Sequence, residues 1–401
     1  MKTNTQEADQ SRALNVGLGS GSPHVLTLTP FYPRANDDAN GCFVAESLAA
    51  LQDIGVRNTV IGVQPFYRGK IGSNPRSTVP AAWRRFFSLP GGAGLPSAGR
   101  FLYSSLLAEV RDLHRQQPVH LIHAHAALPC GHAAALLSRK LGIPFVVTVH
   151  GLDVFFTNQV SGFMGQRCKR VSSRVYDSAA KTICISEKVR HCILKEASAR
   201  TVVVYNGVDE RLFSPVPDTI GRRSILCVGN LIPIKGQELL LRALRDVQQE
   251  FPDVTCDLIG DGPERSRLEQ LAEELKIANF VRFLGRKNRA EVAAAMARCT
   301  LFALPSRYEG LGCVYLEAMA AGKAVIACTG QGIDEIVEHG RNGWLIEPGN
   351  FPALAAALAH LLGNDEMRLL VGAEARRTVL ERYTLAHQAD LLRRIYCESM
   401  A

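Results

Sequence analysis

Short, nearly continuous apolar runs recur along this chain, and amphipathic stretches separate them. In the first half, such runs lie at 24–30, 120–126, 144–150, 181–186 and 201–205. A strand that is buried on both faces has no polar side, so runs without alternation are typical of parallel strands. Parallel strands need crossovers, and the intervening helical patterns, such as the one at 42–55 that ends in a glycine, provide them. The sequence therefore predicts open, parallel α/β sheets.

The pattern divides into two sets of strands, as expected for 401 residues, which are too many for one ordinary core. The break falls at 206–223, a polar segment with two prolines that we take as a hinge. After it, strands are predicted at 224–230, 255–262, 280–285, 300–306, 324–328 and 343–348. Helical patterns fall at 235–250, 264–275, 290–298, 313–321, 351–362, 365–382 and 385–398. We therefore predict an α/β protein with two Rossmann-like, doubly wound domains that face each other across a cleft.

These boundaries divide the chain into five segments. A polar N-terminal tail, rich in glycine and serine, covers 1–22. An N-terminal domain at 23–205 is followed by the hinge at 206–223 and by a C-terminal domain at 224–383. The last segment, 384–401, is a predicted helix that follows the second set of strands and could cross back to the N-terminal domain.

Charge and cysteine content narrow the range of functions. The formal net charge of +8 and the pI of about 9.0 favour anionic partners, such as nucleotide phosphates, nucleic acid or an acidic membrane surface, although a mildly basic enzyme fits equally. The 11 cysteines are odd in number and form no CxxC pair, which indicates a reducing compartment and neither a disulfide framework nor a zinc site. With no apolar signal region and no apolar run near the ~20 residues that span a bilayer, we expect a cytoplasmic protein that could still sit on a membrane.

The stretch SRYEGLGCVYLEAMAAG, residues 306–322, places Glu309 and Glu317 eight positions apart, with a glycine-rich turn after the first. Glycines let the backbone approach a ligand closely, and the following helix directs its positive end to the same place. A phosphate fits there, because the N–H groups of such a turn are free to bind anions. The predicted phosphate-binding amides are those of Gly310, Leu311, Gly312 and Cys313.

The two carboxylates complete a binding order. Glu317 lies about 7–8 Å further along the helix, at a rise of ~1.5 Å per residue. There its carboxylate can accept hydrogen bonds from the hydroxyls of a ribose. Glu309, on the other side of the turn, can bind the hydroxyls of a hexose, so the order matches a nucleoside diphosphate sugar. Two further strand-end loops belong to this domain: VGNLIPIKG, with Asn230 and the phosphate-binding cation Lys235, and the turn GDGPE. Each feature alone is commonly structural, and their joint occurrence favours a binding site.

Over nearly all of the chain after residue 22, the sequence resembles the family 4 retaining glycosyltransferases. PSRYEGLGCVYLEAMAAGKAVIA matches their E-x7-E signature, and VGNLIPIKG, IGDGPE, VRFLG, YNGVD, HAHAALP and TVHGLD match in order. The chain is similar to capsule, exopolysaccharide and teichuronic-type members. The resemblance implies the GT-B fold, with Glu309 holding the donor hexose, Glu317 the ribose and Lys235 the diphosphate. It also implies a UDP- or GDP-sugar as the donor substrate, with no metal and no cofactor required.

Asn230 departs from the family pattern, because many members have an arginine there. An asparagine can donate a hydrogen bond but brings no charge to the leaving diphosphate. Either the helix end and Lys235 suffice, or another cation compensates, with Arg307, Arg286 and Lys287 as the candidates.

Four residues of the first half are further candidates. His150 ends a strand, and the resemblance favours a role for it at the donor sugar or the acceptor. Asp153 is open to two interpretations, orientation of the acceptor hydroxyl or an N-cap. His123 and His125 have the spacing of a metal pair, but faces alternate along a strand and no cysteine or carboxylate is near, so we interpret His123 as structural and His125 as a cleft residue. The amide of Gly41 is placed to meet the diphosphate from the opposite side of the cleft.

Residues 79–105 mix aromatic and basic side chains. Such mixtures suit a membrane interface with anionic headgroups, where a lipid-linked acceptor would lie. The alternative is an ordinary helix and loop whose aromatic side chains fill the core. The residues concerned are Trp83, Phe86, Phe87, Phe101, Arg84, Arg85 and Arg100.

Together these features predict transfer of a hexosyl group, with retention, to a hydroxyl of a glycan or lipid-linked acceptor. We expect this to take place during cell-surface polysaccharide synthesis, at the inner face of the plasma membrane. Three alternatives remain: a sugar-nucleotide 2-epimerase of the same fold, a non-catalytic sugar-nucleotide-binding protein, and a nucleic-acid-binding protein. The last is disfavoured because the basic residues are scattered and form no recognition motif.

Overall fold

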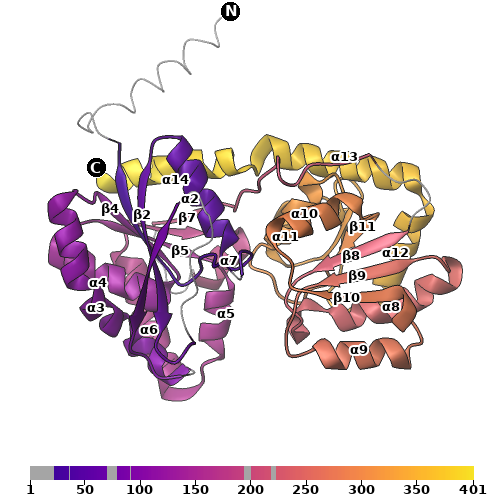
Figure 1. Cartoon of the computed structure of the whole chain (residues 1–401), viewed down its shortest axis with the longest axis horizontal. Coiled ribbons are helices and arrows are strands. Elements are labelled where there is room, and N and C mark those ends of the chain that lie inside the picture. The colour runs from indigo at the N-terminus through magenta and orange to yellow at the C-terminus, as the bar shows by residue number, and fades with distance from the viewer. Residues whose placement is uncertain (1–21, 36, 70–78, 91, 194–199, 218–222) are drawn as a thin grey trace, which may run out of the picture.

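The computed structural model describes residues 22–35, 37–69, 79–90, 92–193, 200–217 and 223–401. Its two α/β halves lie side by side, each built on one parallel sheet (Figure 1). The predicted fold class is confirmed. Residues 1–21 of the predicted tail lie outside the described part of the chain.

The first sheet has seven strands in the order β3-β2-β1-β4-β5-β6-β7, and every neighbouring pair is parallel. The strands are β1 His24–Thr29, β2 Arg57–Pro65, β3 Ala81–Phe86, β4 Leu121–His125, β5 Phe145–Val149, β6 Lys181–Cys184 and β7 Thr201–Val203. The helices are α2 Cys42–Asp53, α3 Leu95–Gln116, α4 His132–Leu141, α5 Leu152–Gln159, α6 Gly162–Ser178 and α7 Glu187–Ile193.

The second sheet has six parallel strands in the order β10-β9-β8-β11-β12-β13. Its strands are β8 Ser224–Val228, β9 Thr255–Ile259, β10 Val281–Gly285, β11 Leu301–Ala303, β12 Val325–Cys328 and β13 Trp344–Ile346. The remaining helices are α8 Gln237–Glu250, α9 Arg265–Glu274, α10 Arg289–Arg298, α11 Cys313–Ala320, α12 Phe351–Gly363, α13 Asp365–Arg382 and α14 Leu385–Met400.

The core explains the continuous apolar runs. Along β1, Val25 packs into one hydrophobic cluster, whereas Leu26 and Leu28 pack into another. Because successive side chains of a strand point to opposite faces, both faces of the sheet are buried. A polar residue on either face would therefore lose its contacts with water.

The region 79–105 differs from the helix and loop of its second interpretation, and the membrane interface stays a prediction. It is not a helix and loop: β3 forms the edge of the first sheet, and α3 begins at Leu95. Phe86 is buried, whereas Phe87 and Phe101 are 52% and 43% exposed, with ring centroids 5.1 Å apart. The aromatic side chains of this region are therefore divided between the core and the surface.

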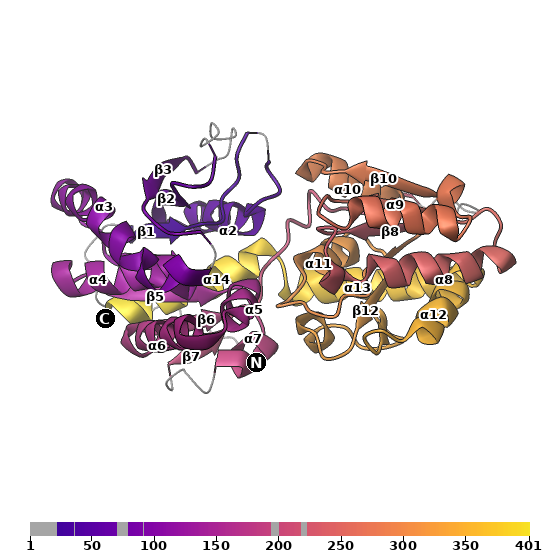
Figure 2. The same cartoon turned by 90° about the horizontal axis from the view of Figure 1, so that it is seen from below.

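Two segments connect the domains, and they lie against each other. The described part of the predicted hinge includes Val208, whose amide donates to Tyr383 O, while the amide of Leu385 donates to Val208 O. Beyond this point α14 crosses to the first domain, where it packs on α2 (Figures 1 and 2). Within the described residues, none of the helices is both long and apolar enough to cross a membrane.

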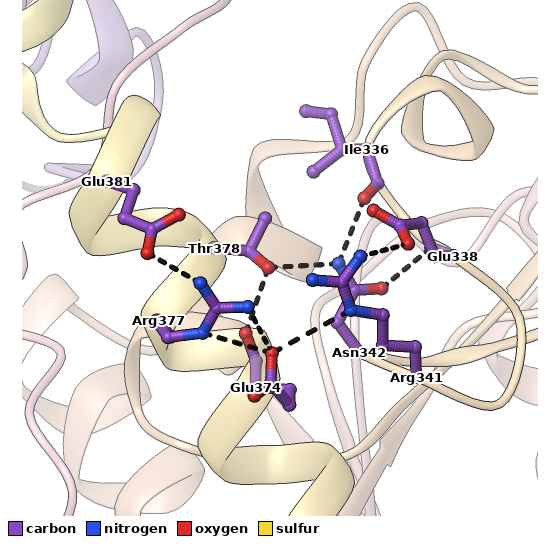
Figure 3. A network of polar contacts seen from close by, with 8 residues as sticks. All are labelled: Ile336, Glu338, Arg341, Asn342, Glu374, Arg377, Thr378 and Glu381. Carbon is purple, nitrogen blue, oxygen red and sulfur yellow. Dashed lines mark hydrogen bonds and ion pairs between the residues drawn. The ribbon is translucent and has the colours of Figure 1, made fainter.

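A polar network joins the turn before β13 to helix α13 (Figure 3). The amide nitrogen of Asn342 donates to Thr378 Oγ1 over 3.0 Å, and Arg341 lies 3.9 Å from Glu374. Glu374 also pairs with Arg377 at 2.6 Å. These contacts fasten the turn before β13 to α13, and so stabilise the end of the second domain that lies away from its site loops.

Candidate functional site

The loops that follow β1, β8, β9 and β10 border a cleft between the two domains. A cavity of about 690 Å³ lies there and is lined by residues of both domains. The predicted site residues that line it are Gly41, His150, Asn230, Glu309, Gly310, Leu311, Gly312 and Cys313. The predicted residues behind this lining are Lys235, Glu317, His125 and Asp153.

The turn before α11 needs its glycines. Gly312 has a φ of 87°, in the left-handed region that side chains other than glycine rarely adopt. A Cβ on Gly310 would lie 2.7 Å from the carbonyl oxygen of His150, and one on Gly151 would lie 2.7 Å from the Cα of Gly310. The two domains therefore touch backbone to backbone at this point.

The amides of this turn are free. In the described part of the chain, the backbone N–H groups of residues 310–313 have no hydrogen-bond acceptor. The turn itself is held by Ser186 of the first domain, whose hydroxyl donates to Gly310 O over 2.5 Å. Tyr308 likewise donates to Gly151 O over 3.0 Å. Free amides at the positive end of a helix, facing a cavity, form a site for an anion.

Lys235 and Glu309 form a buried ion pair. Lys235 Nζ lies 2.5 Å from Glu309 Oε1, and the two side chains are only 11% and 6% exposed. The hydroxyl of Ser306 also donates to this carboxylate, over 2.9 Å. The predicted phosphate cation is therefore bound to the predicted hexose carboxylate.

Glu317 contacts a residue that the sequence did not suggest. Arg289 Nη1 lies 2.5 Å from Glu317 Oε1, while Nε and Nη2 of the same guanidinium donate to both oxygens of Glu46, on α2, over 2.9 and 3.0 Å. The other oxygen of Glu317 is buried and has no partner among the described residues. Arg289 thus links the two domains and leaves one carboxylate oxygen for a ligand.

The charges of this bridge are not balanced, because one cation faces two carboxylates. Burial raises the pKa of Glu46 to about 7, against the opposing charge of Arg289 and with the added effect of Glu317. One sequence signal points to Arg289: a cation in the first turn of a helix is unfavourable, and Arg289 opens α10 directly after the capping residue Asn288. That local cost indicates a tertiary partner.

Three histidines lie together behind the cleft. His125 Nδ1 and His150 Nε2 are 2.9 Å apart, and their rings are stacked. His123 lies on the same face of β4 as His125, with ring centroids 4.3 Å apart, so our assumption of opposite faces was wrong: residues two apart in a strand share a face. His123 is bonded to Tyr396 and Thr148 over 2.7 Å.

Burial keeps these rings neutral. It lowers the pKa of His150 to about 3, and it lowers the pKa of His125 well below its ordinary value. His150 Nδ1 is buried without a partner among the described residues, whereas its Nε2 is held by His125. His150 therefore presents a neutral, oriented ring at the cleft.

Asp153 does not line the cleft. One oxygen of its carboxylate accepts from the backbone amides of His150 and Val154, over 3.1 and 3.0 Å. Burial raises the pKa of Asp153 to about 6. Its visible contacts hold the backbone of His150, which is closer to the capping interpretation than to the acceptor interpretation.

The candidate replacements for an arginine at position 230 are differently placed. Arg286 lines the cleft, and so does Lys287, but their side chains pair with Asp37 and Glu291 at 2.9 and 3.0 Å. Arg307 lines a separate cavity.

The arrangement of two parallel α/β domains around a cleft is the GT-B fold. Solved structures with this fold include HepE of Anabaena in complex with UDP, with a TM-score of 0.72 and 22% identity over 92% of this chain and 98% of that chain. Sucrose-phosphate synthase from Thermosynechococcus elongatus has a TM-score of 0.74 and 20% identity over 93% and 98% of the two chains. At such identities the likeness concerns the fold alone.

The sequence comparisons narrow the class to a family. The model described as Glycosyltransferase Family 4 matches residues 43–212, and the model described as Glycosyl transferases group 1 matches residues 214–378. An uncharacterized glycosyltransferase of Methanocaldococcus jannaschii is 33% identical over 65% of this chain and 71% of its own length. The putative teichuronic acid biosynthesis glycosyltransferase TuaC of Bacillus subtilis is 26% identical over 93% of this chain and 97% of its own. The chain belongs to glycosyltransferase family 4, as its motifs predicted.

Proposed function

We propose that this glycosyltransferase moves a hexosyl group from a nucleoside diphosphate sugar to a hydroxyl, with retention and without a metal. The observation that carries the proposal is the row of free amides at residues 310–313, between the buried carboxylates of Glu309 and Glu317. Anion-binding amides flanked by two acceptors of hydroxyl hydrogen bonds match a ligand with phosphates in its middle and hydroxyls at both ends.

Each end of the donor has its own partner. The ribose binds the free oxygen of Glu317, whose other oxygen is already held by Arg289. The hexose binds Glu309, and Lys235 turns from this carboxylate toward the diphosphate when the donor enters. The relatives include GDP-mannose-dependent mannosyltransferases, while HepE was solved with UDP and UDP-glucose, so both bases belong in a test.

The reaction is cleavage of the bond between the hexose and the diphosphate. Negative charge develops on the leaving phosphate, and the amides of residues 310–313 together with Lys235 stabilise it. Glu309 is the one cleft-lining carboxylate near the turn and is paired with Lys235, which suits binding better than nucleophilic attack. The acceptor oxygen bonds to the anomeric carbon on the face from which the diphosphate leaves, and the leaving phosphate takes the acceptor's proton, so the configuration is retained. The neutral ring of His150 positions a hydroxyl beside this bond.

The acceptor side of the cleft suggests where the enzyme works. We place the acceptor, a glycan or a lipid-linked molecule, against the first domain, and we assign the enzyme to cell-surface polysaccharide synthesis at the inner face of the plasma membrane. Phe87 and Phe101, exposed beside each other, support peripheral contact with a membrane. TuaC, which matches over nearly all of its length, is named as a putative glycosyltransferase of teichuronic acid biosynthesis, and this supports the assignment.

A thermal-shift panel of UDP- and GDP-sugars tests the donor assignment. The cognate donor should raise the melting temperature more than the others do, because a ligand that binds only the folded state stabilises it. Wild-type protein that responds to no nucleotide sugar would refute the proposal.

Product analysis with the selected donor then tests the reaction. NMR of the product gives the configuration at the new bond, and an assay in excess chelator tests metal independence. Release of a free epimer without any acceptor would identify the 2-epimerase instead.

A further inference from the structure

One charged group at the cleft lacks an opposite charge. Of the charged side chains that line the cavity, Asp37 pairs with Arg286, Lys287 pairs with Glu291, and Glu309 pairs with Lys235. Arg68 also lines the cavity, and it has no carboxylate partner within the described residues. An unpaired guanidinium beside a cavity is available to an anionic ligand.

The backbone around Arg68 is fixed from below. Arg68 lies in the turn after β2, and the side chain of Gln64, which is buried, donates to the carbonyl oxygens of Arg68 and Gly69 over 3.0 and 2.7 Å. The turn is therefore held in one place at the rim of the cleft.

Two further arginines converge on the same turn. Arg34, from the loop after β1, donates to the side-chain oxygen of Gln64 and lies 4.3 Å from the ring of Trp83. Arg85, on β3, donates to the carbonyl oxygens of Phe66 and Arg68. Within the described residues, the hydrogen-bond partners of these two guanidinium groups are neutral, and the nearby carboxylate of Asp37 is paired with Arg286. Three positive charges therefore gather without an ion pair of their own.

The neighbouring Arg84 shows that the lack of an ion pair is not common to all arginines of this region. On the same strand, Arg84 pairs with both oxygens of Glu109 at 2.7 Å. Arg34 and Arg85, in contrast, each have a buried Nε without a partner among the described residues. Burial first, and then the nearby charge of Arg68, lower the pKa of Arg34 below its ordinary value, although Asp37 opposes this. An anion bound here would give the buried Nε groups an acceptor and would offset the repulsion between Arg34 and Arg68.

We propose that Arg34, Arg68 and Arg85 form a subsite for a phosphate group of the acceptor, an inference that rests on the proposed function. The guanidinium fork matches phosphate oxygens, and three cations match a doubly charged phosphate ester. The acceptor is thus a phosphate-bearing molecule whose reacting hydroxyl lies deeper in the cavity, toward His150.

The position of the cluster assigns it to the acceptor and not to the donor. All three arginines belong to the first domain, whereas the free amides and Lys235 belong to the second. The loop that carries Arg34 faces β10 across the cleft, because Arg286, after β10, pairs with Asp37 (Figure 2). The cluster therefore lies on the wall opposite the diphosphate site.

Binding to protein that is saturated with its cognate nucleoside diphosphate, UDP or GDP, tests the subsite. The probes are glucose 6-phosphate with glucose as its neutral match, and vesicles that contain phosphatidic acid with vesicles that contain diacylglycerol in its place as theirs. The variants are Arg68→Gln, Arg68→Lys and the control Arg245→Gln, which removes an exposed charge from α8 in the second domain.

We expect a phosphate-bearing probe to bind wild type, to bind Arg68→Gln about tenfold more weakly, and to bind Arg68→Lys with an intermediate loss, since a charge-assisted hydrogen bond contributes about 1.5 kcal/mol or more. Arg245→Gln should match wild type. Binding of glucose 6-phosphate indicates a soluble phosphate ester, and binding of phosphatidic acid alone indicates a lipid-borne one.

Two results would overturn the inference and leave the proposed function intact: equal binding of neutral and phosphate-bearing probes, or a loss in Arg68→Gln that falls on the nucleotide. Wild type that binds neither UDP nor GDP would overturn both.

Discussion

The buried pair of Lys235 and Glu309 allows stability and function to be separated. We expect Lys235→Met and Glu309→Gln each to destabilise the protein, because each leaves one charge buried without its partner at a site where the side chains are 11% and 6% exposed. The double variant Lys235→Met/Glu309→Gln should recover most of that stability, since neither charge is left. All three variants should lose hexosyl transfer.

The size of the effect follows from the burial. Removal of one partner from a buried ion pair costs about 3–5 kcal/mol, and replacement of both partners by neutral groups is often close to neutral. Because 1 kcal/mol corresponds to about 2–4 °C in a domain of 150–250 residues, the single variants should melt about 10 °C below wild type. Ser306, which still donates to Glu309 in Lys235→Met, places that variant toward the smaller loss. The double variant should fall within about 1 kcal/mol of wild type.

Calorimetric melting of the four proteins measures this coupling, and UDP or GDP titration measures the consequence for the donor. Lys235→Met should weaken binding of the nucleoside diphosphate, whereas Glu309→Gln should not, because it releases Lys235 for the phosphates. A double variant as unstable as the single ones would show that the two residues do not compensate each other. A tenfold loss of nucleoside diphosphate affinity in Glu309→Gln would show that Glu309 contributes to binding of the nucleoside diphosphate and not only of the hexose.

Three further perturbations test other parts of the site. Glu317→Gln should weaken UDP or GDP about tenfold and leave pyrophosphate unchanged in calorimetric titrations. It also alters the pair with Arg289, but of the contacts to the ligand only the one to the ribose, a charge-assisted hydrogen bond of about 1.5–3 kcal/mol, is lost. His150→Ala should lower the rate of transfer about 100-fold or more, at an unchanged affinity for the nucleoside diphosphate, because oriented hydrogen-bonding groups at a reacting centre contribute about 3 kcal/mol. Glu46 has its pKa raised from 4.5 to about 7, so the folded state binds its proton more tightly than the unfolded state does. Its contribution to stability is present below pH 4.5 and is lost as the pH rises to about 7, by about 3 kcal/mol relative to Glu46→Gln, as denaturant unfolding across this range would measure.

A specific result would contradict each of these three predictions. Equal losses of UDP and pyrophosphate in Glu317→Gln would move this residue away from the ribose. A His150→Ala variant with wild-type turnover would remove His150 from the reaction. A difference between wild type and Glu46→Gln that stays constant from pH 4.5 to 7 would show that Glu46 titrates normally.

Much of the fold follows from local sequence, because a strand buried on both faces is visible as an apolar run. Every strand predicted in the second half is present, within a few residues at its ends, and the glycine turn at 310–312 precedes a helix as expected. The strands β2 and β3 were missed. The apolar run of β2 is short, 60–63, because polar residues occupy its start at 57–59 and Gln64 follows it. β3 is an edge strand with Arg84 and Arg85 in its second half.

The candidate site residues could be named from the sequence one by one, but the contacts among them could not. Strand-end position was enough to bring His150, Asn230 and Glu309 to one cavity. The pairing of Lys235 with Glu309, 74 residues apart, depends on how two loops meet, and local patterns carry no such information. The bridge through Arg289 depends in addition on the approach of two domains.

The crossing of α14 makes the N-terminal domain discontinuous in sequence. Its last helix is supplied by the chain's C-terminus, and Tyr396 on that helix is bonded to His123, two residues before His125 on β4. A truncation at residue 384 would therefore remove a helix of the N-terminal domain, and the damage would fall near His150. The second domain is an insertion within the first, so an isolated first domain that keeps α14 needs residue 205 joined to residue 384 through a short designed linker.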